Sequence, residues 1–153
     1  MRALFLITSL VIAGCAPSIS HAQRAPRAEA PARSERALVF VLTTGLEDLQ
    51  TMSSVFRHAK AAAEEARLRE VAVLVYGRGV HAFDGDITGR PSGLAESIRA
   101  AMASGVKVLV CASAIERMGV ARERLDPVPT EIVPNAITTL VDYVAQDAAV
   151  VRY

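Results

Sequence analysis

The sequence has no tryptophan, few other aromatic residues, only two cysteines and almost no net charge, and these scarcities exclude several classes of function. Aromatic residues make up 5% of the 153 positions, and the formal net charge is +1. Stacking on nucleic-acid bases relies on aromatic side chains, and binding to phosphate backbones or anionic lipids relies on a cationic surface. We therefore expect no nucleic-acid partner, and no membrane contact of the folded domain itself.

The motifs of common hydrolases and nucleotide-binding proteins are also missing. No G-x-S-x-G, H-E-x-x-H or P-loop occurs, so the sequence gives no support for the hydrolase or nucleotide-binding activities that use these motifs. "GRGVHA" (residues 77–82) fits the G-x-G-x-x-[GA] fingerprint, but it follows the second apolar run rather than the first, and no helix pattern follows it. We interpret it as a loop whose glycines let the backbone approach a site.

His81, Asp84 and Asp86 are three potential metal ligands in one loop. No second cluster completes them, so we interpret the segment as a solvated turn built by "DGD". The sequence predicts neither a metal nor another cofactor.

The first 22 residues have the pattern of a signal peptide. A basic start precedes "ALFLITSLVIAG" (residues 3–14), an apolar run too short to span a bilayer as a helix. "IAGC" resembles a bacterial lipobox, in which Cys15 is lipidated, whereas "SHA" (residues 20–22) suits ordinary cleavage before Gln23. Both alternatives predict export to the periplasm, either as a lipoprotein anchored through Cys15 or as a soluble protein.

The segment 23–36 is rich in Ala, Pro and Arg and has no apolar period. Such a composition cannot bury enough surface to order the chain, so we expect a flexible tether before a domain spanning residues 37–153. Cleavage or acylation removes Cys15 from thiol chemistry. Cys111 is then the single free thiol, and no intrachain disulfide can form.

The domain alternates strand-like and helix-like segments. Residues 37–43, 71–76 and 106–111 are apolar at nearly every position, which is typical of strands covered on both faces of a parallel sheet. Residues 130–133 and 148–152 are weaker runs, expected nearer the sheet edges. This alternation predicts an α/β fold with a mostly parallel sheet of about five strands.

The intervening segments carry helix-start signals. "TGLE" (residues 44–47) and "SAIE" (residues 113–116) have the capping-box pattern, with Thr44 and Ser113 as caps. Ser92 and Asn135 are the expected caps of two further helices, and the last of these carries Ile137, Leu140, Val141 and Val144.

Cys111 lies where the third strand ends and a helix begins. Free cysteine is often a small buried hydrophobe. A thiol beside a helix N-terminus, however, has its thiolate stabilised by the helix dipole and unpaired amides. Active groups of parallel sheets gather at the carboxyl ends of strands, where Thr44, Gly77 and Gly79 are also expected. Residue type and position leave both roles open.

The segment "VLVCASAIERMGV" (residues 108–120) resembles the DsrE/DsrF-like sulfur-relay superfamily, in which a strand ends in cysteine and a C-x-[AS]-A-[IL]-x-R-x-G-[VI] helix follows. "EIVPNAITTLVDYVAQ", "TTGLED" and "YGRGV" match in order, so the resemblance spans residues 37–153. It implies a flavodoxin-like three-layer α/β/α fold, assembled as a homotrimer or homohexamer.

The resemblance also implies a function: the matching cysteine, Cys111, carries a persulfide received from a sulfur donor and passed to an acceptor protein. Arg78 and His81 add positive charge if their loop folds over the thiol. The alternative is a non-catalytic module of the same fold that binds a small ligand or serves assembly, with Cys111 packed in the core.

Overall fold

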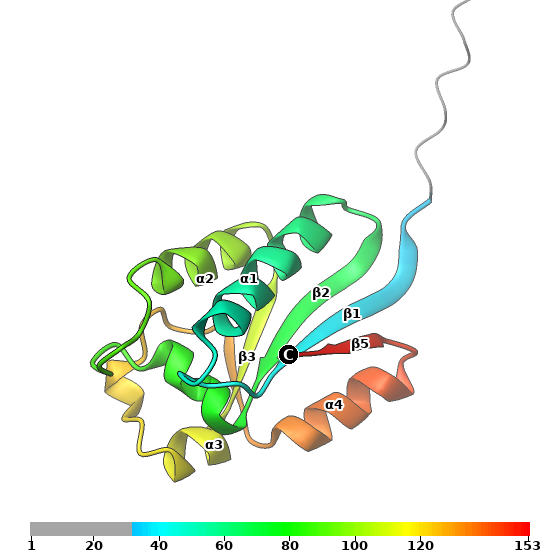
Figure 1. The fold of residues 1–153 in the computed structure, drawn as a ribbon. Coiled ribbons are helices and arrows are strands. Elements are labelled where there is room, and N and C mark those ends of the chain that lie inside the picture. Colours follow the sequence, from blue (N-terminus) through cyan, green and yellow to red (C-terminus); the bar gives the residue numbers. More distant parts are fainter. Residues whose placement is uncertain (1–31) are drawn as a thin grey trace, which may run out of the picture. The chain divides into compact units, whose positions relative to one another are not determined.

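The computed structural model describes residues 32–153, in which five strands alternate with helices (Figure 1). The predicted signal peptide, the lipobox and most of the tether lie outside this range. The strands are β1 (Ser34–Leu42), β2 (Leu68–Val75), β3 (Lys107–Cys111), β4 (Glu131–Val133) and β5 (Ala149–Arg152). The helices are α1 (Leu49–Glu64), α2 (Leu94–Ala103), α3 (Ala112–Arg117) and α4 (Ala136–Ala145), with short 3-10 helices η1 (Gly77–Phe83) and η2 (Arg122–Arg124).

All five strands pair in parallel in the order β4-β3-β2-β1-β5. This arrangement confirms the predicted five-stranded parallel sheet, with the two weaker runs as edge strands. β1 begins at Ser34, so residues 34–36, which the sequence placed in the tether, belong to the strand. Arg33 already contacts the sheet, because its side chain donates hydrogen bonds to the carbonyl oxygens of Leu68 and Arg69.

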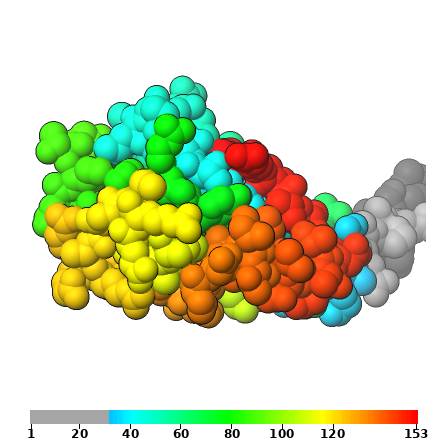
Figure 2. Space-filling model, turned by 90° about the horizontal axis from the view of Figure 1, so that it is seen from below, coloured from blue at the N-terminus to red at the C-terminus, as the bar shows by residue number. Residues whose placement is uncertain are grey.

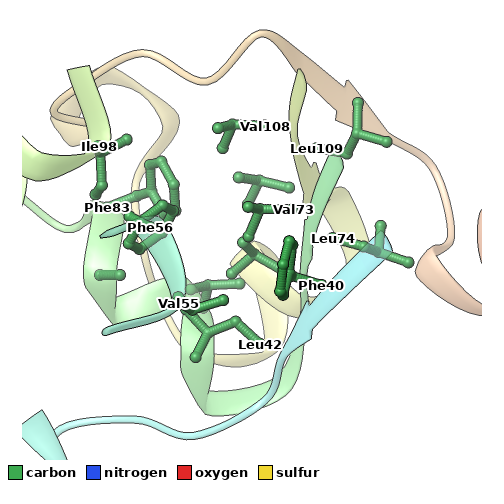
Figure 3. Close-up of a cluster of buried hydrophobic side chains, with 14 of the residues drawn as sticks. Phe40, Leu42, Val55, Phe56, Val73, Leu74, Phe83, Ile98, Val108 and Leu109 are labelled. Carbon is green, nitrogen blue, oxygen red and sulfur yellow. The ribbon is translucent and has the colours of Figure 1, made fainter. Parts of the chain in front are cut away.

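The sheet is the middle of three layers, with α1 and α2 on one face and α4 on the other (Figure 1). Successive strand residues point to opposite faces, so both faces of the central strands are apolar and buried. Phe56 of α1 and Phe83 of η1 meet edge to face, with ring centroids 6.1 Å apart. Figure 3 shows them beside Ile98 and the central strand residue Val73.

Two helix starts differ from the sequence prediction. α1 begins at Leu49, and its cap is Asp48, whose carboxylate accepts from the amide of Thr51 at 3.0 Å. The capping box of Thr44 is wrong: Glu47 accepts from the amide of Gly45, four residues before the helix. Aspartate is at least as good an N-cap residue as threonine. Asp48 can therefore begin the helix, and Thr44 stays in the loop before it.

Of the predicted caps of α4 and α2, the first is confirmed and the second is wrong. Asn135 caps α4 as predicted, since its Oδ1 accepts from the amides of Ile137 and Thr138. Ser92 does not cap α2; Gly93 occupies the N-cap position and contributes no side-chain hydrogen bond.

The outer face of α4 is apolar and exposed. Leu140 packs against the core, but Ile137, Val141 and Val144 are 54–60% exposed. Residues at i, i+4 and i+7 share one side of a helix, so these three form a continuous stripe, called here the α4 stripe. Figure 2 shows α4, in orange, on the molecular surface beside the C-terminal strand in red.

Candidate functional site

Cys111 is the last residue of β3 and the N-cap residue of α3. Ser113, predicted to cap this helix, instead lies inside its first turn, and no side chain caps α3. Its hydroxyl lies 3.2 Å from the Cys111 sulfur and forms a hydrogen bond with it. The predicted cap is therefore wrong, and the serine contacts the thiol directly.

The pairing of β3 with β4 brings a second helix start to the same sulfur. Cys111 is the register partner of Val133, the last residue of β4, and α4 begins three residues later. The backbone amide of Ala136 therefore lies close enough to the sulfur to lower the pKa of the thiol, as do the amides of Ser113 and Ala114.

These contacts determine the acidity of the thiol. Burial raises the pKa of Cys111, but the hydrogen bonds from the Ser113 hydroxyl and from the amides of Ala136, Ala114 and Ser113 outweigh it. The pKa therefore lies below the ordinary value of a cysteine. Donors aimed at sulfur stabilise the thiolate, which is the nucleophilic form.

A cavity of about 300 Å³ opens above the sulfur. Cys111 itself is only 4% exposed, and it is one of the residues that line this cavity. Figure 2 shows the two elements that form much of its wall, α3 in yellow and the start of α4 in orange, on one face of the molecule. The lining residues are Tyr76, Gly77, Cys111, Ser113, Ala114, Arg117, Met118, Asn135, Ala136 and Ile137.

Of the site residues predicted from sequence, the cavity brings together Cys111, Ser113 and Gly77. Gly77 has φ +57°, a left-handed conformation that favours glycine, and it lets the chain turn sharply at the end of β2. Thr44 is not among the cavity-lining residues. It belongs to the loop between β1 and α1.

The remaining three predicted residues belong to η1 and do not line this cavity. Arg78 forms an ion pair with Glu47 at 2.9 Å, so its charge is directed at the loop before α1. A Cβ on Gly79 would lie 2.6 Å from the carbonyl oxygen of Leu42, which explains the glycine as a packing requirement. The Nδ1 atom of His81 is buried without a hydrogen-bond partner.

The loop after η1 forms the expected turn, with Gly85 and Asp86 exposed and the Asp86 amide donating to the Asp84 carboxylate, but Asp84 itself is not solvated. Asp84 is 5% exposed, and its carboxylate pairs with Arg124 at 3.3 Å. Arg124 also approaches Asp86 at 3.9 Å. Burial of a carboxylate calls for such a cationic partner. Among the described residues, no group of three His, Cys, Asp or Glu side chains is placed to hold a metal ion.

Sequence reasoning did not identify seven of the ten lining residues as site residues: Tyr76, Ala114, Arg117, Met118, Asn135, Ala136 and Ile137. Tyr76 follows β2 directly, so its place at the carboxyl edge was a usable signal. The others come from α3 and α4, and only the β3–β4 pairing brings these helices together.

A second cavity of about 300 Å³ lies near the amino ends of β2 and β3, and two of its charged residues, Glu70 and Lys107, are paired with each other. Glu70 forms an ion pair with Lys107 at 2.5 Å and accepts a hydrogen bond from the Tyr143 hydroxyl at 2.5 Å. Burial raises the pKa of Glu70, but Lys107 and Tyr143 outweigh it, so the pKa is lowered. This satisfied cluster anchors α4 to the sheet and has no free nucleophile.

Comparison with known proteins adds two findings. The model of the DsrE/DsrF-like family matches residues 36–153. A search of curated proteins gave no match.

Solved structures share the fold. The ychN protein of E. coli is 16% identical with a TM-score of 0.62, and the match covers 78% of this chain and 100% of that one. MTH1491 of Methanobacterium thermoautotrophicum, described as a protein of unknown function, is 16% identical with a TM-score of 0.59 and the same coverage. BT1422 of Bacteroides thetaiotaomicron, described likewise, is 15% identical with a TM-score of 0.61, covering 76% and 94%. At such identities the likeness concerns the fold alone.

Proposed function

This chain belongs to the DsrE/DsrF-like family, and on that premise we propose that Cys111 carries sulfur as a persulfide. One observation carries the proposal: the thiol lines a cavity and has the Ser113 hydroxyl 3.2 Å from its sulfur, and this hydroxyl and the nearby amides lower its pKa. A cysteine that only fills space in a core has no need of a cavity beside it or of groups that stabilise its thiolate.

The chemistry balances without an oxidant. The Cys111 thiolate attacks the outer sulfur of a donor persulfide, a new S–S bond forms, and the donor's S–S bond breaks to release the donor as a thiolate. The outer sulfur then lies about 2 Å beyond the cysteine sulfur, inside the cavity. Transfer to an acceptor thiolate repeats the same exchange in reverse.

The test is mass spectrometry of the folded full chain after incubation with a low-molecular-weight persulfide. We expect one added sulfur atom, located by peptide mapping on Cys111 and absent from Cys111→Ser. Peptide mapping of the wild type separates Cys111 from Cys15 even if the variant folds poorly. A folded Cys111 that takes no sulfur, and reacts with alkylating reagents only after denaturation, would replace this proposal with the binding or assembly module.

We also propose that the chain forms a homo-oligomer, a trimer or a hexamer. The α4 stripe supports this proposal, together with Val150 and Val151 of the edge strand β5, which are 42% and 39% exposed. Contiguous exposed apolar surface is typical of protein interfaces. Light scattering across a concentration series tests it, and a monomer at every concentration would refute it.

Export to the periplasm remains a proposal supported by the sequence of residues 1–22, with a lipid anchor on Cys15 as the favoured form. Within residues 32–153, no helix is both long and apolar enough to cross a membrane. The mass of the N-terminal peptide from natively expressed protein distinguishes lipidation of Cys15 from cleavage before Gln23.

A further inference from the structure

Arg117 is the charged residue among the ten that line the Cys111 cavity. It lies in the last turn of α3 and is exposed. Within residues 32–153, no carboxylate lies within ion-pair distance of its guanidinium. Nearby arginines differ: Arg122 pairs with Glu116 at 3.7 Å, and Arg124 pairs with Asp84.

The charge of Arg117 is also not used by the thiolate. The groups that stabilise the Cys111 sulfur are the Ser113 hydroxyl and three backbone amides. Along α3, the rise of 1.5 Å per residue separates positions 111 and 117 by about 9 Å. The cavity is therefore lined both by the Cys111 thiol and by a cationic side chain whose charge the thiol does not use.

The size of this cavity limits the ligand. A volume of about 300 Å³ lies at the lower end of the range for small-molecule sites, which suits a molecule of about amino-acid size. The other side chains of the wall, such as Tyr76, Met118 and Ile137, are largely apolar. A ligand that fits has a sulfur atom, a short carbon chain and one anionic group.

We propose that Arg117 selects, as the sulfur donor, a persulfide of amino-acid size that carries a carboxylate. The proposal rests on the proposed role of Cys111 as sulfur acceptor. The guanidinium binds the carboxylate and places the outer sulfur of the donor against the Cys111 thiolate. Arg117 is thus a specificity-determining residue, and the sulfur exchange itself is the one described above.

Iodoacetate and iodoacetamide test this selection, because they have nearly the same size and differ in charge. Each alkylates the Cys111 thiolate with loss of iodide. The rates for the folded full chain are followed on the Cys111 peptide and divided by those of the denatured chain, which removes the intrinsic difference between the reagents. The same ratios are measured for Arg117→Gln, Arg117→Lys and the matched control Arg122→Gln, an arginine outside the cavity.

We expect the normalised preference for iodoacetate to fall about threefold to fivefold in Arg117→Gln, which is the range of an exposed ion pair. Arg117→Lys should retain part of it, Arg122→Gln should retain all of it, and added salt should weaken it. The persulfide of 3-mercaptopropionate should load Cys111 faster than that of its neutral amide, with the difference lost in Arg117→Gln.

Failure of the selection and failure of the sulfur-carrier role give different results. If Cys111 accepts sulfur but both charge preferences are the same in Arg117→Gln and the wild type, the selection by Arg117 is refuted and the carrier role stands. If folded Cys111 takes up no sulfur from either persulfide, the carrier role fails and the proposed donor selection falls with it.

Discussion

Replacing Ser113 with alanine tests whether hydrogen bonds control the reactivity of Cys111. The substitution removes the hydroxyl that lies 3.2 Å from the sulfur and leaves the three amides in place. Hydrogen bonds to charged groups contribute about 1.5–3 kcal/mol, and a shift of one pKa unit corresponds to about 1.4 kcal/mol. Water can enter the cavity and replace part of this bond, so we expect the pKa of Cys111 to rise by about one unit.

The assay is the rate of alkylation by iodoacetamide, followed over a pH series that brackets the ordinary thiol value of about 8.5. In Ser113→Ala the midpoint should move to higher pH. Below the midpoint, the thiolate fraction falls about tenfold for one unit. The rate should fall only about threefold, because a more basic thiolate is the better nucleophile. Ser97→Ala, whose hydroxyl bonds to Gly93 within α2, is the matched control.

The same shift has a consequence for stability. The pKa of Cys111 is lower in the folded chain than in the unfolded chain, so ionisation of this thiol stabilises the fold above the unfolded value of about 8.5. That contribution is lost as the pH falls through the folded pKa, and it should shrink in Ser113→Ala. Equal midpoints in the wild type and Ser113→Ala would show that the serine does not stabilise the thiolate, and would refute the electrostatic argument.

Other substitutions test the fold, the interface and the N-terminus. Phe56→Ala should lower the free energy of unfolding by about 3–5 kcal/mol, measured by urea denaturation, because it empties a fully buried site; a loss below 1 kcal/mol would contradict the packing described here. Gly79→Ala should cost about 1–3 kcal/mol in the same assay, since its Cβ would overlap the Leu42 carbonyl. Val141→Asp should dissociate the proposed oligomer in light scattering without unfolding the protomer. Cys15→Ala should move the protein out of the membrane fraction if the lipobox is used, and an unchanged distribution would refute the anchor.

The sheet was predictable from sequence because its signal is local and strong. Strands buried on both faces are apolar at nearly every position, and the two weaker runs became the edge strands β4 and β5. The cap of α4 was predictable for a similar reason, since Asn135 is the one strong capping residue directly before that helix.

The remaining features depend on contacts between distant segments. Thr44 and Asp48 are both suitable N-cap residues, and the sequence alone does not show that Asp48 is the one that caps α1. Arg117 and Asn135 meet in one cavity only because β4 pairs with β3. The apolar pattern of α4 did not separate residues that face the core, such as Leu140, from residues exposed on the protomer, such as Val141.

The pairing of β3 with β4 makes the thiol sensitive to motion at the edge of the sheet. β4 has three residues and is an edge strand, and short edge segments open at lower free energy than the centre of a domain. A slip of one residue would move the Ala136 amide by about 3.3 Å and so reduce its effect on the pKa of Cys111. Opening of this edge would therefore raise the pKa of the Cys111 thiol for as long as the opening lasts.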